Sequence, residues 1–175
     1  MDEKSQIRLK VRRLFTENRR QISELSNAII TKLEVDNDFI ESQTIAIYWS
    51  LPDEVSTHKL ITKWYKHKTI LLPVIQGDIL VLKKFEGQEK LVDGMKYHIP
   101  EPAGEIYTTY DKINLIITPG MAFDKENNRM GRGKGFYDRL LPDLKCKKIG
   151  ICFGFQLFDK IPSEPHDIKV DKVIC

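Results

Sequence analysis

The sequence contains few cysteines, and their spacing excludes two common structural roles. The three, Cys146, Cys152 and Cys175, form no C-x-x-C pair. An odd set without such a pair indicates neither a disulfide framework nor a zinc knuckle. The four histidines lack the spacing of metal ligands, and we expect His98, within a long polar stretch, at the surface. A reducing cytoplasm is therefore the expected location.

Long hydrophobic runs, internal repeats and low-complexity tracts are also missing. No apolar stretch approaches the roughly 20 residues that span a bilayer. The first residues, MDEKSQIRLKVRR, carry charges where a signal peptide has its apolar segment. With 41% hydrophobic and 30% charged residues, the chain is typical of a globular protein and not of a disordered one. Its 175 residues predict a single domain, 1–175, without a membrane partner.

The net charge of +3 conceals an uneven distribution. Residues 1–20 carry seven basic and three acidic side chains, and residues 129–148 carry seven basic and two acidic ones. These two basic segments have balances of +4 and +5, which leaves −6 on the rest of the chain. Two basic segments on an acidic body predict an anionic partner. Charge alone leaves open a nucleic acid, a nucleotide or another acidic small molecule.

Hydrophobic periodicity predicts helices that alternate with short strands. Apolar residues recur at helical spacing from Glu3 to Leu33, as one long helix or two, with Ser23 a candidate cap for the second. Further helices are expected at Ser56–His67 and Phe136–Leu141. Strands are expected at Thr44–Ser50, Thr69–Ile75, Ile79–Phe85, Ile113–Thr118, Lys148–Phe153 and Lys169–Ile174. We therefore predict an α/β fold: a single three-layer α/β/α domain with a largely parallel central sheet, on which the basic helical segment 3–33 packs.

Ligands of such sheets bind beyond the carboxyl ends of the strands. Two loops meet that rule: Ser50–Thr57 and Pro119–Gly135. The polar stretch Gly87–Tyr110 is a longer excursion, and long loops within compact domains are often functional. These three segments are the candidates for the site.

The loop Pro119–Gly135 has the composition of an anion site. In it, glycines 131, 133 and 135 alternate with Arg132 and Lys134, directly before a predicted helix. Glycines free backbone amides to point at an anion, and a helix N-terminus adds unpaired N–H groups. Neither the P-loop pattern nor the dinucleotide pattern fits these residues. The combination suits a phosphate chain, although a basic, glycine-rich turn without a ligand has the same residues.

The run PGMAFD, followed by NRMGRGKGFYDRLL, resembles the signature of the 5-formyltetrahydrofolate cyclo-ligase family, also called 5,10-methenyltetrahydrofolate synthetases. Four separated segments extend the resemblance. They are Lys4-x-x-x-Arg8, Tyr48–Val55, the I-P-x-P of Ile99–Pro102, and Ile168–Asp171, which is similar to a D-x-x-V-D. Two positions depart from the family pattern: Asn127 stands where Gly is frequent, and Phe136 where Tyr is frequent.

The resemblance implies an ATP- and Mg²⁺-dependent ligase that forms a C–N bond in a folate. The formyl oxygen of 5-formyltetrahydrofolate would attack the γ-phosphate of ATP. The neighbouring folate nitrogen would then displace phosphate, giving 5,10-methenyltetrahydrofolate, ADP and phosphate. Phosphoryl transfer depends mainly on positioning and charge neutralisation, so the lack of an activated nucleophile is expected. The expected partners are these small molecules, with no nucleic acid and with the chain as a monomer.

The resemblance also implies the site residues. ATP would contact Lys4, Arg8, Arg129, Gly131, Arg132, Gly133, Lys134, Gly135, Phe136 and Tyr137. The folate would contact Arg8, Trp49, Glu54, Arg132, Gly133, Lys134, Gly135 and Phe136. Lys134, Arg132 and Tyr137 would act in catalysis, and Asp138 and Asp171 would hold Mg²⁺.

Several of these residues also suit ordinary structural roles. Lys4 and Arg8, four residues apart, suit one shared anion or a solvated helix face. Trp49 suits either a pterin surface or the core. Asp138 is also a favourable first-turn acid. The rival functions are a nucleic-acid-binding module, suggested by the basic segments, and a sugar-phosphate isomerase or transferase on a related scaffold.

Overall fold

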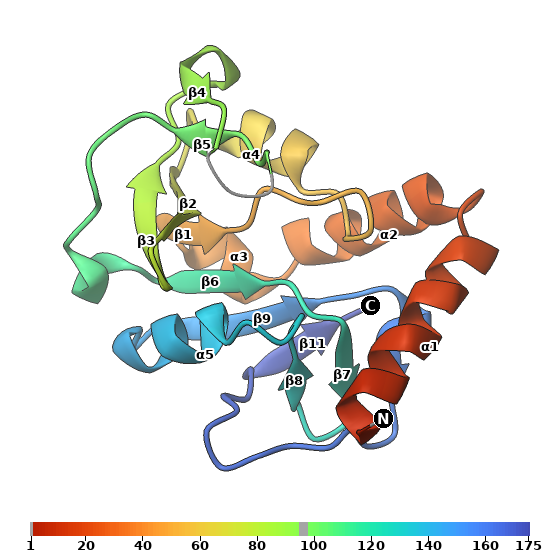
Figure 1. The fold of residues 1–175 in the computed structure, drawn as a ribbon. Coiled ribbons are helices and arrows are strands. Elements are labelled where there is room, and N and C mark those ends of the chain that lie inside the picture. The colour runs from red at the N-terminus through yellow and green to blue at the C-terminus, as the bar shows by residue number, and fades with distance from the viewer. Residues whose placement is uncertain (1, 95–97) are drawn as a thin grey trace.

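The computed structural model describes residues 2–94 and 98–175, and a six-stranded sheet runs through that part of the chain (Figure 1). Its strands follow the order β11–β9–β6–β1–β2–β3. Their bounds are Thr44–Ile47 (β1), Thr69–Gln76 (β2), Ile79–Lys84 (β3), Leu115–Thr118 (β6), Lys147–Ile151 (β9) and Lys172–Ile174 (β11). Every neighbouring pair is parallel except the β2–β3 hairpin. The largely parallel sheet predicted from the sequence is confirmed.

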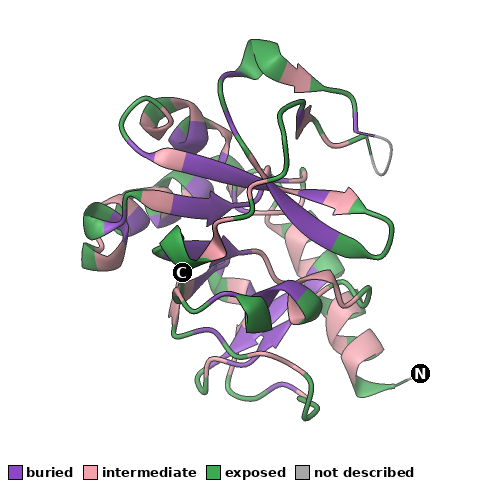
Figure 2. Cartoon of the chain, turned by 90° about the vertical axis from the view of Figure 1, so that its left-hand side faces the viewer, coloured by how far each residue is buried: buried purple, intermediate pink, exposed green. Residues whose placement is uncertain are grey.

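Helices cover both faces of this sheet, as strands that are apolar on both sides require. One face packs against α2 (Ile22–Glu34), α3 (Asn37–Glu41) and α4 (His58–Trp64), which share a core cluster with β1 and its neighbours. The other face packs against α5 (Phe136–Leu140) and the 3₁₀ turn Leu141–Asp143. Figure 2 shows that the central strands are largely buried between these layers. The three-layer α/β/α expectation is confirmed.

The N-terminal segment forms two helices: α1 (Glu3–Glu17), followed after a short turn by α2. The carboxylate of Asp2 caps α1 by accepting a hydrogen bond from the Ser5 N–H at 2.6 Å. The expected cap at Ser23 is wrong, because α2 begins at Ile22 and Ser23 falls within its first turn. α1 lies beside the strand β7 at one edge of the molecule (Figure 1). Among the described residues, no helix combines the length and the apolar character needed to cross a membrane.

The segment 119–135, expected as a loop, begins with a hairpin that the sequence did not predict. A small second sheet contains β7 (Ala122–Asp124), β8 (Arg129–Met130) and β10 (Leu157–Phe158). The buried Asp124 carboxylate organises the hairpin turn by accepting bonds of 2.9 Å from both the backbone and the side-chain N–H of Asn128. Asn127 adopts φ +64° in this turn, a conformation that Asn tolerates better than most residues. That tolerance accounts for Asn at a position where Gly is frequent.

The polar excursion 87–110 also contains regular structure. Its elements are a two-stranded hairpin, β4 (Leu91–Val92) with β5 (Glu101–Pro102), and the 3₁₀ turns Gln88–Lys90 and Tyr110–Lys112. A further 3₁₀ turn, Gly154–Gln156, follows β9. His98 is exposed, as expected, and takes φ +50°.

Candidate functional site

Two neighbouring pockets lie where the order of the sheet reverses. β1 has β2, the next strand along the chain, on one side and β6 on the other. Loops that leave such neighbours diverge, so a crevice forms beyond their carboxyl ends. An apolar pocket of about 370 Å³ opens there, and a charged pocket of about 340 Å³ adjoins it. Gly131, Gly135 and Asp138 line both, so the glycine loop (residues 131–135) is their common wall.

The walls of the apolar pocket come from four parts of the fold. They are the end of β1, the β2–β3 hairpin, the segment that follows β6, and the helix α5. The apolar and aromatic side chains are Tyr48, Trp49, Leu51, Pro73, Ile75, Leu80, Ile99, Pro119, Phe136 and Tyr137. Trp49 also packs against the core, and the His58 ring stacks on its indole with centroids 4.1 Å apart. Burial lowers the pKa of His58, so the stacked ring is neutral near pH 7. Trp49 therefore both packs against the core and lines the pocket, and its contact with a pterin stays a prediction.

Glu54 places a carboxylate in this apolar pocket. One oxygen accepts the Leu51 N–H at 2.9 Å, and the other lies 3.2 Å from Nη2 of Arg132. Arg132 also donates two hydrogen bonds to Asp53, of 3.0 and 2.6 Å. Burial raises the pKa of Glu54, and the contacts with Leu51 and Arg132 offset only part of that effect. The exposed arginine is a partner that Glu54 can exchange for the N–H groups of a ligand.

Arg129 lines the apolar pocket and contacts Asp138, which lines both pockets. Its Nη2 donates to Oδ1 of Asp138 at 2.7 Å, and its Nη1 donates to the Pro119 carbonyl at 3.4 Å. The guanidinium carbon lies 5.4 Å from the centre of the Tyr137 ring. Burial raises the pKa of Tyr137, so its phenol stays protonated and can donate a hydrogen bond to a ligand.

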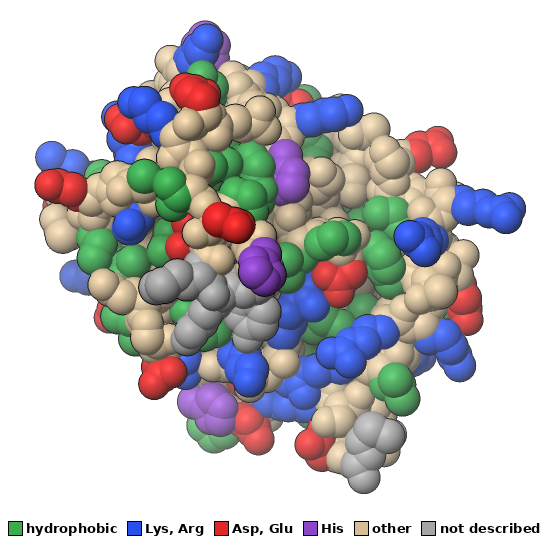
Figure 3. Space-filling model, turned by 45° about the horizontal axis from the view of Figure 1, so that its top comes forward, with side chains coloured by type: hydrophobic (Ala, Val, Ile, Leu, Met, Phe, Trp, Pro, Cys, Tyr) green, Lys and Arg blue, Asp and Glu red, His purple; other side chains and the backbone are tan. Residues whose placement is uncertain are grey.

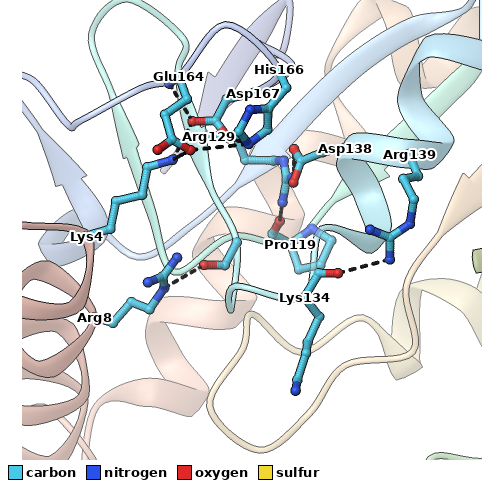
Figure 4. A network of polar contacts seen from close by, with 11 residues as sticks. Lys4, Arg8, Pro119, Arg129, Lys134, Asp138, Arg139, Glu164, His166 and Asp167 are labelled. Atoms are coloured by element: carbon cyan, nitrogen blue, oxygen red, sulfur yellow. Dashed lines mark hydrogen bonds and ion pairs between the residues drawn. The ribbon is translucent and has the colours of Figure 1, made fainter. Parts of the chain in front are cut away.

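The charged pocket draws on segments that are far apart in the sequence (Figure 4). It is lined by Lys4, Arg8, Met130, Gly131, Gly133, Gly135, Asp138, Arg139, Glu164, His166 and Asp167. Lys4 donates to Asp167 at 2.7 Å and to Glu164 at 3.0 Å. Partial burial by itself would lower the pKa of Lys4, but the two carboxylates outweigh this effect and raise that pKa. Its ammonium is therefore fully charged.

Arg8, one turn further along α1, contacts the glycine loop directly. Its Nε donates to the Gly131 carbonyl at 3.0 Å, and a Cβ at Gly133 would lie 3.5 Å from its Nη2. Lys4 and Arg8 thus face the same pocket, as their spacing allowed. Lys and Arg side chains gather on this side of the molecule beside hydrophobic and acidic ones (Figure 3). The two basic segments found in the sequence therefore meet in space.

The conformation of the glycine loop depends on its glycines. Gly133 and Gly135 have φ values of +95° and +66°, which side-chain-bearing residues rarely adopt. A Cβ at Gly135 would stand only 2.8 Å from Nη1 of Arg139. The Lys134 side chain borders the apolar pocket and points away from Lys4 and Asp167 in Figure 4. α5 begins at Phe136, directly after the loop as expected, and because it is only five residues long its dipole adds little.

The two aspartates expected to share Mg²⁺ do not lie together. Asp138 is in the common wall of the pockets, whereas Asp171 precedes β11 and its carboxylate accepts the Lys148 N–H at 2.7 Å. Lys148 is at the amino end of β9, away from the carboxyl ends where the pockets open. Asp167 is the acidic residue of the same D-x-x-V-D run that reaches the charged pocket. Asp138 and Asp167 thus line the charged pocket together, whereas Asp171 lines neither pocket.

Sequence reasoning missed Asp167, Glu164 and Arg139. The first aspartate of D-x-x-V-D was a usable signal for Asp167, since both acidic positions of that pattern are present. Glu164 had no comparable signal, because it lies in an irregular segment, and neither had Arg139, because its place on α5 does not reveal which pocket it faces. Glu164, His166 and Asp167 have ligand atoms within 4.8 Å of one another.

The thiols are unsuited to nucleophilic chemistry. Burial raises the pKa of Cys152 and of Cys146, which keeps both protonated. Neither residue lines the two pockets. Cys146 and Cys152 therefore lie outside the candidate site.

Comparison with known proteins places these features in a family. The sequence model of the 5-formyltetrahydrofolate cyclo-ligase family matches residues 1–175. The 5-formyltetrahydrofolate cyclo-ligase of Escherichia coli K12 is 29% identical over 171 residues, which cover 93% of this chain and 93% of the relative. The mouse 5-formyltetrahydrofolate cyclo-ligase is 29% identical over 186 residues, which cover 98% of this chain and 90% of the relative.

A solved structure shows the same fold. The NMR structure of 5,10-methenyltetrahydrofolate synthetase from Aquifex aeolicus superimposes with a TM-score of 0.88 and 32% sequence identity. The superposition covers 99% of this chain and 89% of the other. The similarity therefore includes the glycine loop, α1 and the sheet together.

Proposed function

Because this chain belongs to the 5-formyltetrahydrofolate cyclo-ligase family, we propose that it uses Mg-ATP to close the ring of 5-formyltetrahydrofolate. The products would be 5,10-methenyltetrahydrofolate, ADP and phosphate. One observation carries the proposal: an apolar pocket and a charged pocket share the glycine loop as their wall. Transfer of a phosphoryl group needs donor and acceptor side by side, and this arrangement supplies two adjoining places for them.

The apolar pocket suits the folate. Its volume, about 370 Å³, lies in the range of small-molecule sites, and Trp49, Phe136 and Tyr137 offer flat surfaces to aromatic rings. Among the described residues that line that pocket, Glu54 and Asp138 are the carboxylates, and an ionised carboxylate accepts paired N–H groups such as those of a pterin. Binding would exchange the Arg132 contact of Glu54 for these N–H groups.

The charged pocket suits the triphosphate of ATP. Lys4 and Arg8 supply positive charge from α1, and the open backbone of Gly133 and Gly135 brings amide groups close to a ligand. The meeting of the two basic segments at this pocket explains both of them without a nucleic-acid partner. The described residues of a single chain line both pockets, so we propose that a monomer suffices.

The carboxylates of the charged pocket fit Mg²⁺. This ion prefers hard oxygen ligands and is usually held by one or two carboxylates together with substrate phosphates and water. Asp138 and Asp167 would hold it, and it would neutralise charge on the phosphates when bound. In the structure Lys4 neutralises Asp167, so its ammonium would pass to a phosphate oxygen when the ion binds.

The proposed reaction joins the contents of the two pockets. The formyl oxygen attacks the γ-phosphorus, the bond to ADP breaks, and a phosphorylated iminium forms on the folate. The neighbouring folate nitrogen then attacks the formyl carbon, and phosphate leaves with the oxygen and takes up the proton of that nitrogen. Lys134 and Arg132, at the rim of the apolar pocket, would stabilise the negative charge on the transferred group. Tyr137, held protonated by burial, would donate a hydrogen bond to the same group.

An absorbance assay tests the proposal. Purified protein with Mg-ATP and 5-formyltetrahydrofolate should generate new near-ultraviolet absorbance from the methenyl product. The same mixture without ATP, or with the metal chelated, should stay unchanged. Lys134→Ala should reduce turnover strongly while the circular dichroism spectrum stays the same. If micromolar enzyme produces no change in absorbance under any of these conditions, the proposed reaction is wrong.

A further inference from the structure

Arg139 of α5 joins the glycine loop to the β2–β3 hairpin. Its Nε and Nη2 donate to the Asp78 carbonyl at 2.9 and 2.6 Å. Nη2 also donates to the Lys134 carbonyl at 3.0 Å. Asp78 lies in the turn between β2 and β3, whereas Lys134 is the fourth residue of the glycine loop. One guanidinium therefore holds the loop against a separate part of the fold, as Figure 4 shows for its bond to Lys134.

The charge of Arg139 is not neutralised within the protein. Both of its acceptors are uncharged carbonyls, and no ion pair joins it to a carboxylate in residues 2–94 or 98–175. Lys4, by contrast, is paired with Glu164 and Asp167 in the same pocket. The ammonium of Lys4 must first leave these carboxylates, whereas the guanidinium of Arg139 can meet an anion without losing a partner.

The remaining nitrogen of Arg139 lies on the wall of the charged pocket. Nη1 stands 2.8 Å from the point where a Cβ at Gly135 would be, and Gly135 and Arg139 both line this pocket. The guanidinium itself is steadied by Phe136, since its carbon lies over the ring, 5.4 Å from the ring centre. A guanidinium presents five N–H donors in a rigid fork, so bonds to two carbonyls leave donors for an oxyanion.

We propose that Arg139 is a further phosphate-binding residue of the charged pocket, one that also fixes the glycine loop in the conformation that receives the phosphates. The inference deepens the proposed function and rests on it for the identity of the ligand as a triphosphate. Its two parts come from one side chain: Nε and Nη2 hold the loop, and Nη1 supplies the charge. Loss of the guanidinium should therefore weaken phosphate binding more than folate binding.

Direct binding of inorganic tripolyphosphate with Mg²⁺, measured by titration calorimetry, tests this without relying on turnover. Arg139→Gln keeps a polar side chain but removes the charge, and should weaken binding about tenfold or more, the size expected for a hydrogen bond to a charged group. Arg139→Lys restores the charge without the fork and should recover part of the affinity. Arg20→Gln, at an exposed arginine in the turn between α1 and α2, is the matched control and should bind like the wild type.

Steady-state kinetics provide the second readout. In Arg139→Gln, KM for ATP should rise by a larger factor than KM for 5-formyltetrahydrofolate, whereas a merely structural role would leave their ratio unchanged. Tripolyphosphate binding by Arg139→Gln within twofold of the wild type would overturn the inference. A wild type that binds tripolyphosphate through Arg139 but makes no methenyl product would contradict only the proposed function. A wild type that does not bind tripolyphosphate would contradict both.

Discussion

The guanidinium of Arg129 and the carboxylate of Asp138 lie 2.7 Å apart in the wall between the two pockets. The Arg129 side chain is 2% exposed, and its Nε has no partner among the described residues. Asp138 is the carboxylate that compensates this buried charge. The pair therefore links the stability of the fold to the residue proposed to hold Mg²⁺.

Asp138→Asn should lower both stability and magnesium-dependent activity. The amide keeps an oxygen near Arg129 but removes the compensating charge, so we expect the free energy of unfolding to fall by about 1–3 kcal/mol. Thermal denaturation measures that loss. Activity should fall steeply at every Mg²⁺ concentration, and a magnesium titration that matches the wild type would exclude Asp138 from the metal site.

Asp167→Asn should shift the magnesium dependence, because Asp167 reaches the charged pocket. We expect activity to require at least about tenfold more Mg²⁺, as for loss of a charged ligand. Asp159→Asn is the matched control, since Asp159 forms an exposed pair with Lys125 away from both pockets. Asp171→Asn tests the expectation from the sequence. If that variant shifts the titration and Asp167→Asn does not, the structural assignment of the ion is wrong.

Glu54→Gln should remove an acidic limb from the pH profile. Burial raises the pKa of Glu54, so the carboxylate becomes protonated at a higher pH than an ordinary glutamate. The pterin N–H groups need the ionised form, and kcat/KM for 5-formyltetrahydrofolate should therefore fall as pH decreases through that raised pKa. In Glu54→Gln the value should be lower by at least about tenfold and should lack this limb. If the acidic limb of kcat/KM persists in Glu54→Gln, a group other than Glu54 causes it.

Gly135→Ala should disturb the glycine loop through the single carbon atom, Cβ, that it adds. The alanine would have to adopt φ +66°, and its Cβ would stand 2.8 Å from Nη1 of Arg139, so the Arg139 side chain must move. We expect a loss of about 1–2 kcal/mol of stability from the left-handed conformation, together with weaker ATP binding. Gly104→Ala is the control, because nothing lies within 4 Å of a Cβ there. Equal melting temperatures and equal KM for ATP in the two variants would contradict the requirement for glycine.

The sheet could be predicted from sequence because its signals are local. Short apolar runs such as Leu115–Thr118 are buried along their whole length, and their period and composition reveal this without knowledge of the fold. The glycine loop could also be recognised in the sequence, since Gly133 and Gly135 take a conformation that few other residues adopt. Both kinds of signal lie within a few neighbouring residues.

The composition of the charged pocket could be predicted only in part. Its residues come from α1, β8, the glycine loop, α5 and the segment 164–167, and their meeting depends on how α1 lies beside the small sheet of β7, β8 and β10. That sheet has strands of two or three residues, too short for a periodic pattern. The choice between Asp167 and Asp171 depended on this geometry, because both stand in one short run.

The glycine loop that separates the two pockets also has a consequence for inhibitor chemistry. The partition is thin where glycines form it, so a single compound could place a pteridine-like ring on one side and a polyphosphate mimic on the other. The tether would pass over Gly131 or Gly135, which line both compartments. Such a compound would combine two weak attachments into one tight one through effective concentration.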